Sequence, residues 1–132
     1  MILADTSAWV EYLRGTGSPV GMRLRGLIGA GSLATTDVVV MEVLAGARDD
    51  LRRQRLRTLL GQCEYIRTAA PEDFEQAAAV SARCRRSGFT VRALTDCLLA
   101  AVALREGVTI LHADRDFEAI AGCMPLLLDV TA

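Results

Sequence analysis

The chain has 132 residues, enough for one domain with a core of its own, and we expect a single domain over residues 1–132. Hydrophobic residues make up 52% and charged residues 23%, and the apolar runs are short, which excludes a disordered chain and a membrane span of about 20 residues. The formal net charge is −1, all fifteen basic residues are arginines, and no function that requires a lysine fits this chain.

The start of the chain and its cysteines indicate the compartment. No basic stretch followed by an apolar segment and a cleavage site begins the sequence, so we expect a cytoplasmic protein without a secretory signal. The four cysteines lie far apart in the sequence, without a C-x-x-C pair. We therefore expect reduced thiols and neither a zinc site, a redox pair nor a disulfide framework.

Short apolar stretches alternate with helical periodicity along the first half of the chain. "MILA" reads as a buried strand and "TSAWVEYL" as a helix with Trp9 and Leu13 on one face. After a turn at "GTGSP", residues 19–31 predict an amphipathic helix and "SLATT" a second strand. Residues 37–50 and 51–63 then predict two helices that meet near Arg48.

The second half repeats this alternation. "EYIRT" is a candidate strand, and residues 71–88 form a helix with Pro and acids at its start and arginines and Gly at its end. "TDCLLAAVALREG" predicts another helix, "VTILHA" a strand, "DRDFEAIAG" a short helix and "PLLLDV" a last strand. Strands that alternate with helices predict the α/β class, with a mostly parallel central sheet and helices on both faces.

Two acids follow strands of this expected sheet. Asp5 comes directly after "MILA", and Asp114 directly after "VTILHA". Sites in parallel sheets form at the carboxyl ends of the strands, so both carboxylates are candidates for one site. Each acid taken alone is better explained as an N-cap that begins the next helix.

Two further acids stand in apolar helices. Glu42 is the only charge between Asp37 and Arg48, and a functional role is favoured over an outward-pointing surface position. Asp96 begins a helix that is apolar for nearly three turns; a helix start suits an acid in any role, but a buried carboxylate needs a partner.

Four carboxylates in one place repel one another by about 4 kcal/mol per pair at about 4 Å, so a site built from them requires a cation. All-oxygen ligands without Cys or His suit Mg²⁺, with Mn²⁺ as a substitute. Such a site fits hydrolysis of a phosphodiester. Thr6 and Ser7 are candidates to hydrogen-bond a carboxylate or a phosphate, or to cap the helix, and Asp116 is either a further ligand or an acid in a first helical turn.

The segments around these acids carry a resemblance. "ILADTSAWVEYL", "VVVMEVLAGAR", "TDCLLAAVAL" and "ILHADRDFEAIA" resemble, in this order, the four acidic segments of PIN-domain ribonucleases of the VapC type, the toxins of bacterial toxin–antitoxin pairs. The resemblance covers essentially the whole chain. It implies a PIN-like three-layer domain.

The same resemblance implies an activity and a set of ligands. It implies a Mg²⁺-dependent endoribonuclease that acts on RNA, often transfer RNA, and a cognate VapB-type antitoxin that blocks the site; VapC-type toxins also commonly form homodimers. The ligands implied are Asp5, Glu42, Asp96 and Asp114, with Asp116 as an adjunct.

Other functions remain open from the residues alone. A non-catalytic PIN-like module that binds RNA or protein is the main alternative, and a DNA-directed metal-dependent nuclease is the second. A response-regulator domain lacks its lysine here, and a haloacid-dehalogenase-like phosphatase would have an acid where Ser7 stands. The arginines of "DDLRRQRLRTLL" fit either a solvated face or contacts with RNA phosphates or an antitoxin.

Overall fold

The computed structural model describes residues 1–129, which contain four strands and seven helices. In chain order they are β1 (Ile2–Ala4), α1 (Thr6–Arg14), α2 (Pro19–Ala30), β2 (Leu33–Thr36), α3 (Asp37–Ala45), α4 (Asp50–Leu60), β3 (Glu64–Ile66), α5 (Glu72–Arg86), α6 (Leu94–Glu106), β4 (Thr109–Leu111) and α7 (Arg115–Cys123). The predicted α/β class is confirmed.

The four strands form one parallel sheet in the order β3-β2-β1-β4. Ile2 of β1 lies opposite Leu33 on one side and Thr109 on the other. The chain adds β2 and β3 on one side of β1 and then returns to place β4 on the other side. The strand order therefore reverses between β1 and β4, and ligands of open α/β sheets bind at the carboxyl ends of the strands next to such a reversal.

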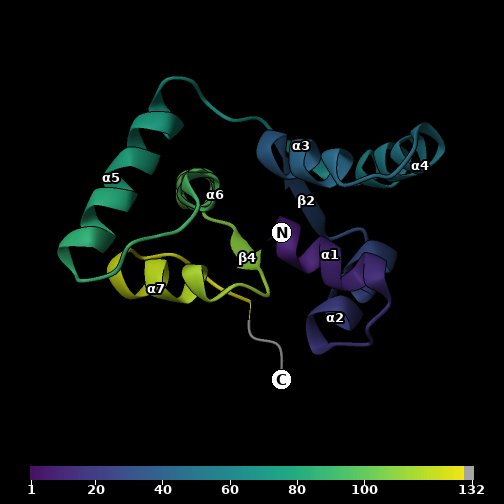
Figure 1. Ribbon diagram of the computed structural model, residues 1–132, viewed down its shortest axis with the longest axis horizontal. Coiled ribbons are helices and arrows are strands. Elements are labelled where there is room, and N and C mark those ends of the chain that lie inside the picture. The colour runs from purple at the N-terminus through teal and green to yellow at the C-terminus, as the bar shows by residue number, and fades with distance from the viewer. Residues whose placement is uncertain (130–132) are drawn as a thin grey trace.

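Helices cover both faces of this sheet, as the sequence predicts. Figure 1 shows α1 to α4 on one side of the strands and α5 to α7 on the other. The strand residues Leu3, Ala4, Ile110 and Leu111 are completely buried between the two groups. Trp9 of α1 and Phe117 of α7 are the largest of the fully buried side chains. The core therefore lies directly beneath the carboxyl ends of β1 and β4.

Capping residues and glycines mark the ends of the helices, as the sequence predicts. The side chain of Ser18 caps α2 by accepting a hydrogen bond from the Gly21 N–H, and Pro19 takes the first helical position. Gly31 and Gly107 end α2 and α6 with φ of 68° and 64°, a left-handed conformation that glycine adopts without strain. Both glycines turn the chain directly into the next strand.

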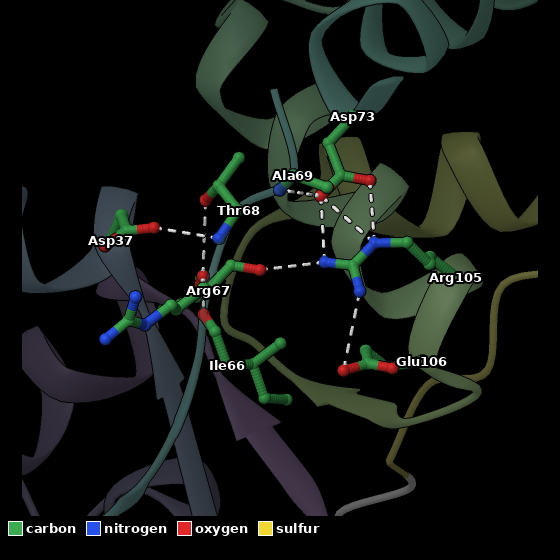
Figure 2. A network of polar contacts seen from close by, with 9 residues as sticks. Asp37, Ile66, Arg67, Thr68, Ala69, Asp73, Arg105 and Glu106 are labelled. Atoms are coloured by element: carbon green, nitrogen blue, oxygen red, sulfur yellow. Dashed lines mark hydrogen bonds and ion pairs between the residues drawn. The ribbon is translucent and has the colours of Figure 1, made fainter. Parts of the chain in front are cut away.

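An ion-pair network fixes the last turn of α6. The Arg105 guanidinium donates to both carboxylate oxygens of Asp73, at 2.9–3.2 Å, and to the carbonyl oxygen of Arg67 at 2.8 Å. Figure 2 shows this network, in which the Ala69 N–H also donates to Asp73. Because Asp73 stands at the start of α5, the network ties α5, α6 and the segment after β3 together.

The predicted last strand is wrong in extent. Within residues 125–129 only Leu128 forms a β-bridge, with Ile110, and Val130 lies outside the described residues. Pro125 has no N–H to donate, and the Leu126 N–H turns back to the Met124 carbonyl oxygen, so too few backbone groups remain for a ladder.

Two other expectations can be compared with the described residues. All four cysteines are free, with Cys84 and Cys97 buried, as predicted. Over residues 1–129 no helix is long and apolar enough to cross a membrane. A single domain over 1–132 stays a prediction.

Candidate active site

Asp5 stands between β1 and α1 and serves both as a cap and as part of a pocket. Its carboxylate accepts a hydrogen bond from the Ala8 N–H at 3.0 Å, and its own N–H extends β1 by donating to Leu111 in β4. The side chain is only 4% exposed, yet it lines an open pocket at the carboxyl ends of β1 and β4. Asp5 therefore is the N-cap of α1, and it also lies where a site residue is expected.

Two hydroxyl side chains of α1 hydrogen-bond to groups that line this pocket. Ser7 Oγ donates to Asp5, at 2.7 and 2.9 Å from its two oxygens, and accepts from the Ala113 N–H at 2.8 Å. Thr6 Oγ1 donates to Glu42 Oε1 at 2.8 Å and thereby joins α1 to α3. The two hydroxyls therefore hold the Asp5 and Glu42 carboxylates, and Ser7 also holds the backbone that precedes Asp114. The N-terminal cap of α1 in this structure is Asp5.

Three further acids gather around the start of α6. One carboxylate oxygen from each of Asp96, Asp114 and Asp116 lies within 4.8 Å of the others. Asp96 stands in the first turn of α6, and Asp114 caps α7 by accepting from the Asp116 N–H at 3.0 Å. Asp116 is 3% exposed. Asp5 and Glu42 are outside this group of three, but they line the same pocket as Asp96 and Asp114.

The electrostatics of Asp96 reflect this crowding. Burial, followed by the negative charges of Asp114, Asp5, Asp116 and Glu42, raises the pKa of Asp96 to about 7. Burial also raises the pKa of Asp5, although hydrogen bonds from Ala8 and Ser7 oppose this shift. The charges of the predicted site residues therefore act on one another, and the protein alone does not neutralise them.

These donors fit a hard divalent cation. The pocket presents carboxylate and hydroxyl oxygens from the β1–α1 junction, α1, α3, α6 and the β4–α7 junction, and no cysteine is among its lining residues. Several carboxylates share this pocket, and the pKa of two of them, Asp5 and Asp96, is raised. A bound cation would relieve this arrangement. Asp96, Asp114 and Asp116 could hold an ion directly. Asp5 and Glu42 line the same pocket as Asp96 and Asp114, whereas Asp116 is not among the residues that line it.

One cation near the acids was not predicted from the sequence. Arg92, in the loop before α6, lies 3.4 Å from Asp114 and 3.5 Å from Asp116. In the sequence it belongs to the basic run "RCRRSGFTVR", which reads as a surface cluster. Nothing in that local pattern indicates a contact with residues 22 and 24 positions further along the chain.

A second groove continues from the acidic pocket, sharing Thr6, Val10 and Glu42 with it. Trp9 and Leu56 contribute to its apolar part, and its arginines are Arg14, Arg48, Arg52 and Arg55. Arg52 is paired with Asp49 at 3.1 Å. The arginine-rich α4 thus lines a groove that adjoins the acidic pocket.

Two aromatic residues near the site are packed. Trp9 is fully buried, and the rings of His112 and Phe117 lie 5.4 Å apart. The Asp114 N–H donates to His112 Nδ1 at 3.2 Å. His112 therefore shapes the β4–α7 turn that carries the acids.

Comparison with known proteins gives a family and relatives. Residues 2–122 match the model of the PIN domain. The chain is 43% identical over 123 residues to ribonuclease VapC11 of Mycobacterium tuberculosis and to a VapC ribonuclease of Mycobacterium bovis, covering 92% of this chain and 92% of each relative. Ribonuclease VapC51 of M. tuberculosis is 32% identical over 95 residues, 70% of this chain and 66% of that protein.

Solved structures share the fold. VapBC2 from Rickettsia felis, bound to a DNA fragment from its promoter, superposes with a TM-score of 0.75 at 18% identity over 100% of both chains. M. tuberculosis VapC20, described as a toxin that cleaves the sarcin-ricin loop, gives 0.65 at 22% identity over 96% of this chain and 99% of the other. At such identities the likeness concerns the fold alone.

Proposed function

The chain belongs to the PIN domain family, and from this premise we propose that it is a VapC-type endoribonuclease toxin of a toxin–antitoxin pair. It hydrolyses phosphodiester bonds of RNA at the acidic pocket between β1 and β4. The similarity to curated VapC ribonucleases over 92% of the chain supports this class of activity. Structured RNA, such as transfer RNA, is the proposed substrate.

One observation carries the proposal: carboxylates from four separate segments act on one another at the point where the strand order reverses. Asp5 follows β1, Glu42 is on α3, Asp96 begins α6 and Asp114 follows β4. The raised pKa of Asp96, about 7, is the energetic sign of this convergence. A fold does not need such repulsion, so its presence favours a site that acts with a cation.

Mg²⁺ is the proposed cofactor, with Mn²⁺ as a substitute. Asp96, Asp114 and Asp116 would hold it, with Asp5 and Glu42 completing the acidic surroundings. When bound, the cation would neutralise phosphate charge and make water a better nucleophile at neutral pH.

Hydroxyl residues of this chain keep the carboxylates in place. Ser7 orients Asp5 and holds the backbone before Asp114, while Thr6 orients Glu42. With these bonds made, the carboxylates lose little freedom when a ligand arrives. An RNA phosphate therefore meets a site whose geometry is set in advance.

A partner and an assembly follow from the same proposal. The similarity to curated VapC ribonucleases and the family resemblance support a cognate VapB-type antitoxin as the inhibitor. Solved structures that share the fold include VapBC2 from Rickettsia felis and a toxin–antitoxin complex from Klebsiella pneumoniae. A homodimer is proposed as well, on the family resemblance. The cytoplasm is the compartment in which such a toxin would meet both RNA and antitoxin.

The test is cleavage of mixed structured RNA by the purified protein in Mg²⁺, Mn²⁺ or EDTA. Asp5→Asn removes one acid of the pocket, and Glu75→Gln removes an exposed acid on α5 as the matched control. We expect discrete cleavage that requires metal, survives in Glu75→Gln and disappears in Asp5→Asn. The same assay with single-stranded DNA tests the nature of the substrate.

The outcomes separate the alternatives. Equal cleavage by all three proteins would indicate a contaminating ribonuclease, and cleavage of DNA alone would replace the ribonuclease by a deoxyribonuclease. RNA binding without cleavage in any metal, across tRNA and ribosomal RNA, would favour a non-catalytic binding module.

A further inference from the structure

Arg92 makes the only ion pairs to the acidic cluster within residues 1–129. Its Nη2 atom lies 3.4 Å from Asp114 Oδ1 and its Nε atom 3.5 Å from Asp116 Oδ2. The Arg92 backbone N–H donates to the same Asp116 oxygen at 3.3 Å. One residue thus places a positive charge against two of the three acids that could hold a metal ion.

The need for this charge is greatest at Asp116. Its side chain is 4% exposed, and a buried carboxylate without a counter-charge is costly. The described residues supply that counter-charge from Arg92 alone. Asp96, the third acid of the group, has no ion pair in the same part of the chain. The cluster is therefore only partly neutralised.

The contact of Arg92 with the two acids is weak enough for its guanidinium to be displaced. The Arg92 side chain is 73% exposed, and its two ion pairs are long, at 3.4 and 3.5 Å. Water can replace the protein around an exposed guanidinium at little cost, so the arginine is held by charge and not by packing. Arg105 gives a contrast within the same chain. Its side chain is half as exposed as that of Arg92, and its guanidinium donates three hydrogen bonds to Asp73 at 2.9–3.2 Å, so it is held more tightly.

A neighbouring arginine shows that proximity in the sequence does not produce this contact. Arg115 lies between Asp114 and Asp116 in the chain, is exposed, and makes no ion pair within the described residues. It carries the same charge in the same neighbourhood. Arg92, unlike Arg115, reaches the carboxylates with its guanidinium.

We propose that Arg92 is an internal counter-ion of the acidic cluster, which competes with the divalent cation for Asp114 and Asp116. In the metal-free protein the guanidinium offsets part of the repulsion, and a cation binds by displacing it. Arg92 thereby stabilises the metal-free fold and lowers the affinity for metal. This inference rests on the proposed metal site and adds a residue that sets its affinity.

The experiment measures Mn²⁺ binding to the whole protein by calorimetry, without RNA. Arg92→Gln removes the guanidinium, Arg92→Lys keeps a positive charge, and Arg115→Gln is the matched control for the change in net charge. We expect Arg92→Gln to bind Mn²⁺ about 5- to 10-fold more tightly than the wild type, because the competing ion pairs are gone. Arg115→Gln is expected to stay within about 2-fold, and Arg92→Lys to lie between the wild type and Arg92→Gln.

Thermal unfolding gives an independent readout on the same proteins. In EDTA, Arg92→Gln should melt below Arg115→Gln, and saturating Mn²⁺ should raise its melting temperature by more than that of the wild type. Mn²⁺ binding that is unchanged or weaker in Arg92→Gln, alongside a wild type that binds Mn²⁺, would overturn the counter-ion role and leave the proposed function standing. A wild type that binds no Mn²⁺ would overturn the metal centre and this inference together.

Discussion

The two ends of α6 place carboxylates in opposite situations. At its last turn, Arg105 pairs with Asp73, and the hydrogen bonds from Arg105 and Ala69 outweigh burial and hold the pKa of Asp73 below its usual value. At its first turn, burial and four neighbouring acids raise the pKa of Asp96 to about 7. The same helix, 13 residues long, therefore contributes the arginine that satisfies a carboxylate of α5 at one end and carries an unsatisfied carboxylate of its own at the other.

The difference separates structure from function. A carboxylate that accepts hydrogen bonds from a guanidinium and a backbone N–H has its negative charge offset and stabilises the fold. An acid surrounded by other acids reduces the stability of the metal-free fold, and the chain keeps that cost only where a ligand relieves it. Counting acids cannot make this distinction, whereas the direction of the pKa shift does.

The largest expected effect is on catalysis. Asp96→Asn should lower RNA cleavage by about 1,000-fold, since it removes one of the acids proposed to hold the cation. This factor corresponds to a loss of about 4 kcal/mol in transition-state stabilisation. Asp73→Asn should leave cleavage per folded molecule within about 3-fold. Initial rates, normalised to the folded fraction from circular dichroism, measure both. A similar loss of rate in the two variants would remove the contrast between the two ends of α6.

The next largest effect is on stability and concerns the last turn of α6. Arg105→Gln leaves the buried Asp73 carboxylate without its counter-charge and should lower the free energy of unfolding by about 2 kcal/mol, a value below that for a fully buried pair because Arg105 is partly in solvent. Urea unfolding in EDTA measures it. If Asp96→Asn were the more destabilising of the two, Asp96 would be the structural acid.

A third effect is the dependence of stability on pH. In the metal-free protein the folded chain keeps a proton on Asp96 up to about pH 7, while the unfolded chain loses it near the ordinary pKa of 3.8. Because the folded state binds more protons in this window, stability should fall as the pH rises from about 4 to 7 and level off above it. Melting temperatures in EDTA should drop by about 3–5 °C between pH 5.5 and 7.5.

Two variants sharpen this pH effect. Asp96→Asn should flatten the slope, while Asp73→Asn should leave it unchanged, because the lowered pKa of Asp73 places its titration below this window. Excess Mg²⁺ should reverse the trend, since the cation binds the deprotonated carboxylate. A slope that persists in Asp96→Asn would assign it to another group.

Much of the fold was predictable because its signals are local. Ser18, Pro19 and the glycines at helix ends mark boundaries by their own backbone preferences, and apolar runs mark the strands. The prediction of a last strand was wrong in extent because it relied on the apolar residues of the final segment. Pro125 and the turn at Met124 leave that segment only one β-bridge. A hydrophobic pattern says where a segment is buried and not how many hydrogen bonds it makes.

The candidate site was predictable to a similar depth. Asp5 and Asp114 could be placed at one edge because strand ends meet there, and Glu42 because it interrupts an apolar helix. Arg92 could not be predicted, since its contacts depend on the position of the loop before α6 relative to α7. The Arg105–Asp73 pair was missed for the same reason: each residue alone looks like an ordinary acid or base at a helix end.

The smallest expected effect tests whether a hydrogen bond alone can satisfy a carboxylate. Asp37 has no ion pair in the described residues. Hydrogen bonds from Tyr65 and Thr68 outweigh burial and lower the pKa of Asp37. Burial and the hydrogen bond to Asp37 raise the pKa of Tyr65 to about 12. Tyr65→Phe should cost only about 0.5 kcal/mol, because water replaces the phenol at this half-exposed site.

Carboxyl NMR titration of Tyr65→Phe should show the pKa of Asp37 moving up toward its ordinary value, while the Thr68 N–H bond prevents a complete return. A cost as large as that of Arg105→Gln would mean that neutral hydrogen bonds satisfy an acid as well as an arginine does. Asp5, which already accepts bonds from Ser7 and Ala8, would then count as a satisfied acid. The raised pKa of Asp5 argues against that, because its hydrogen bonds do not overcome its burial.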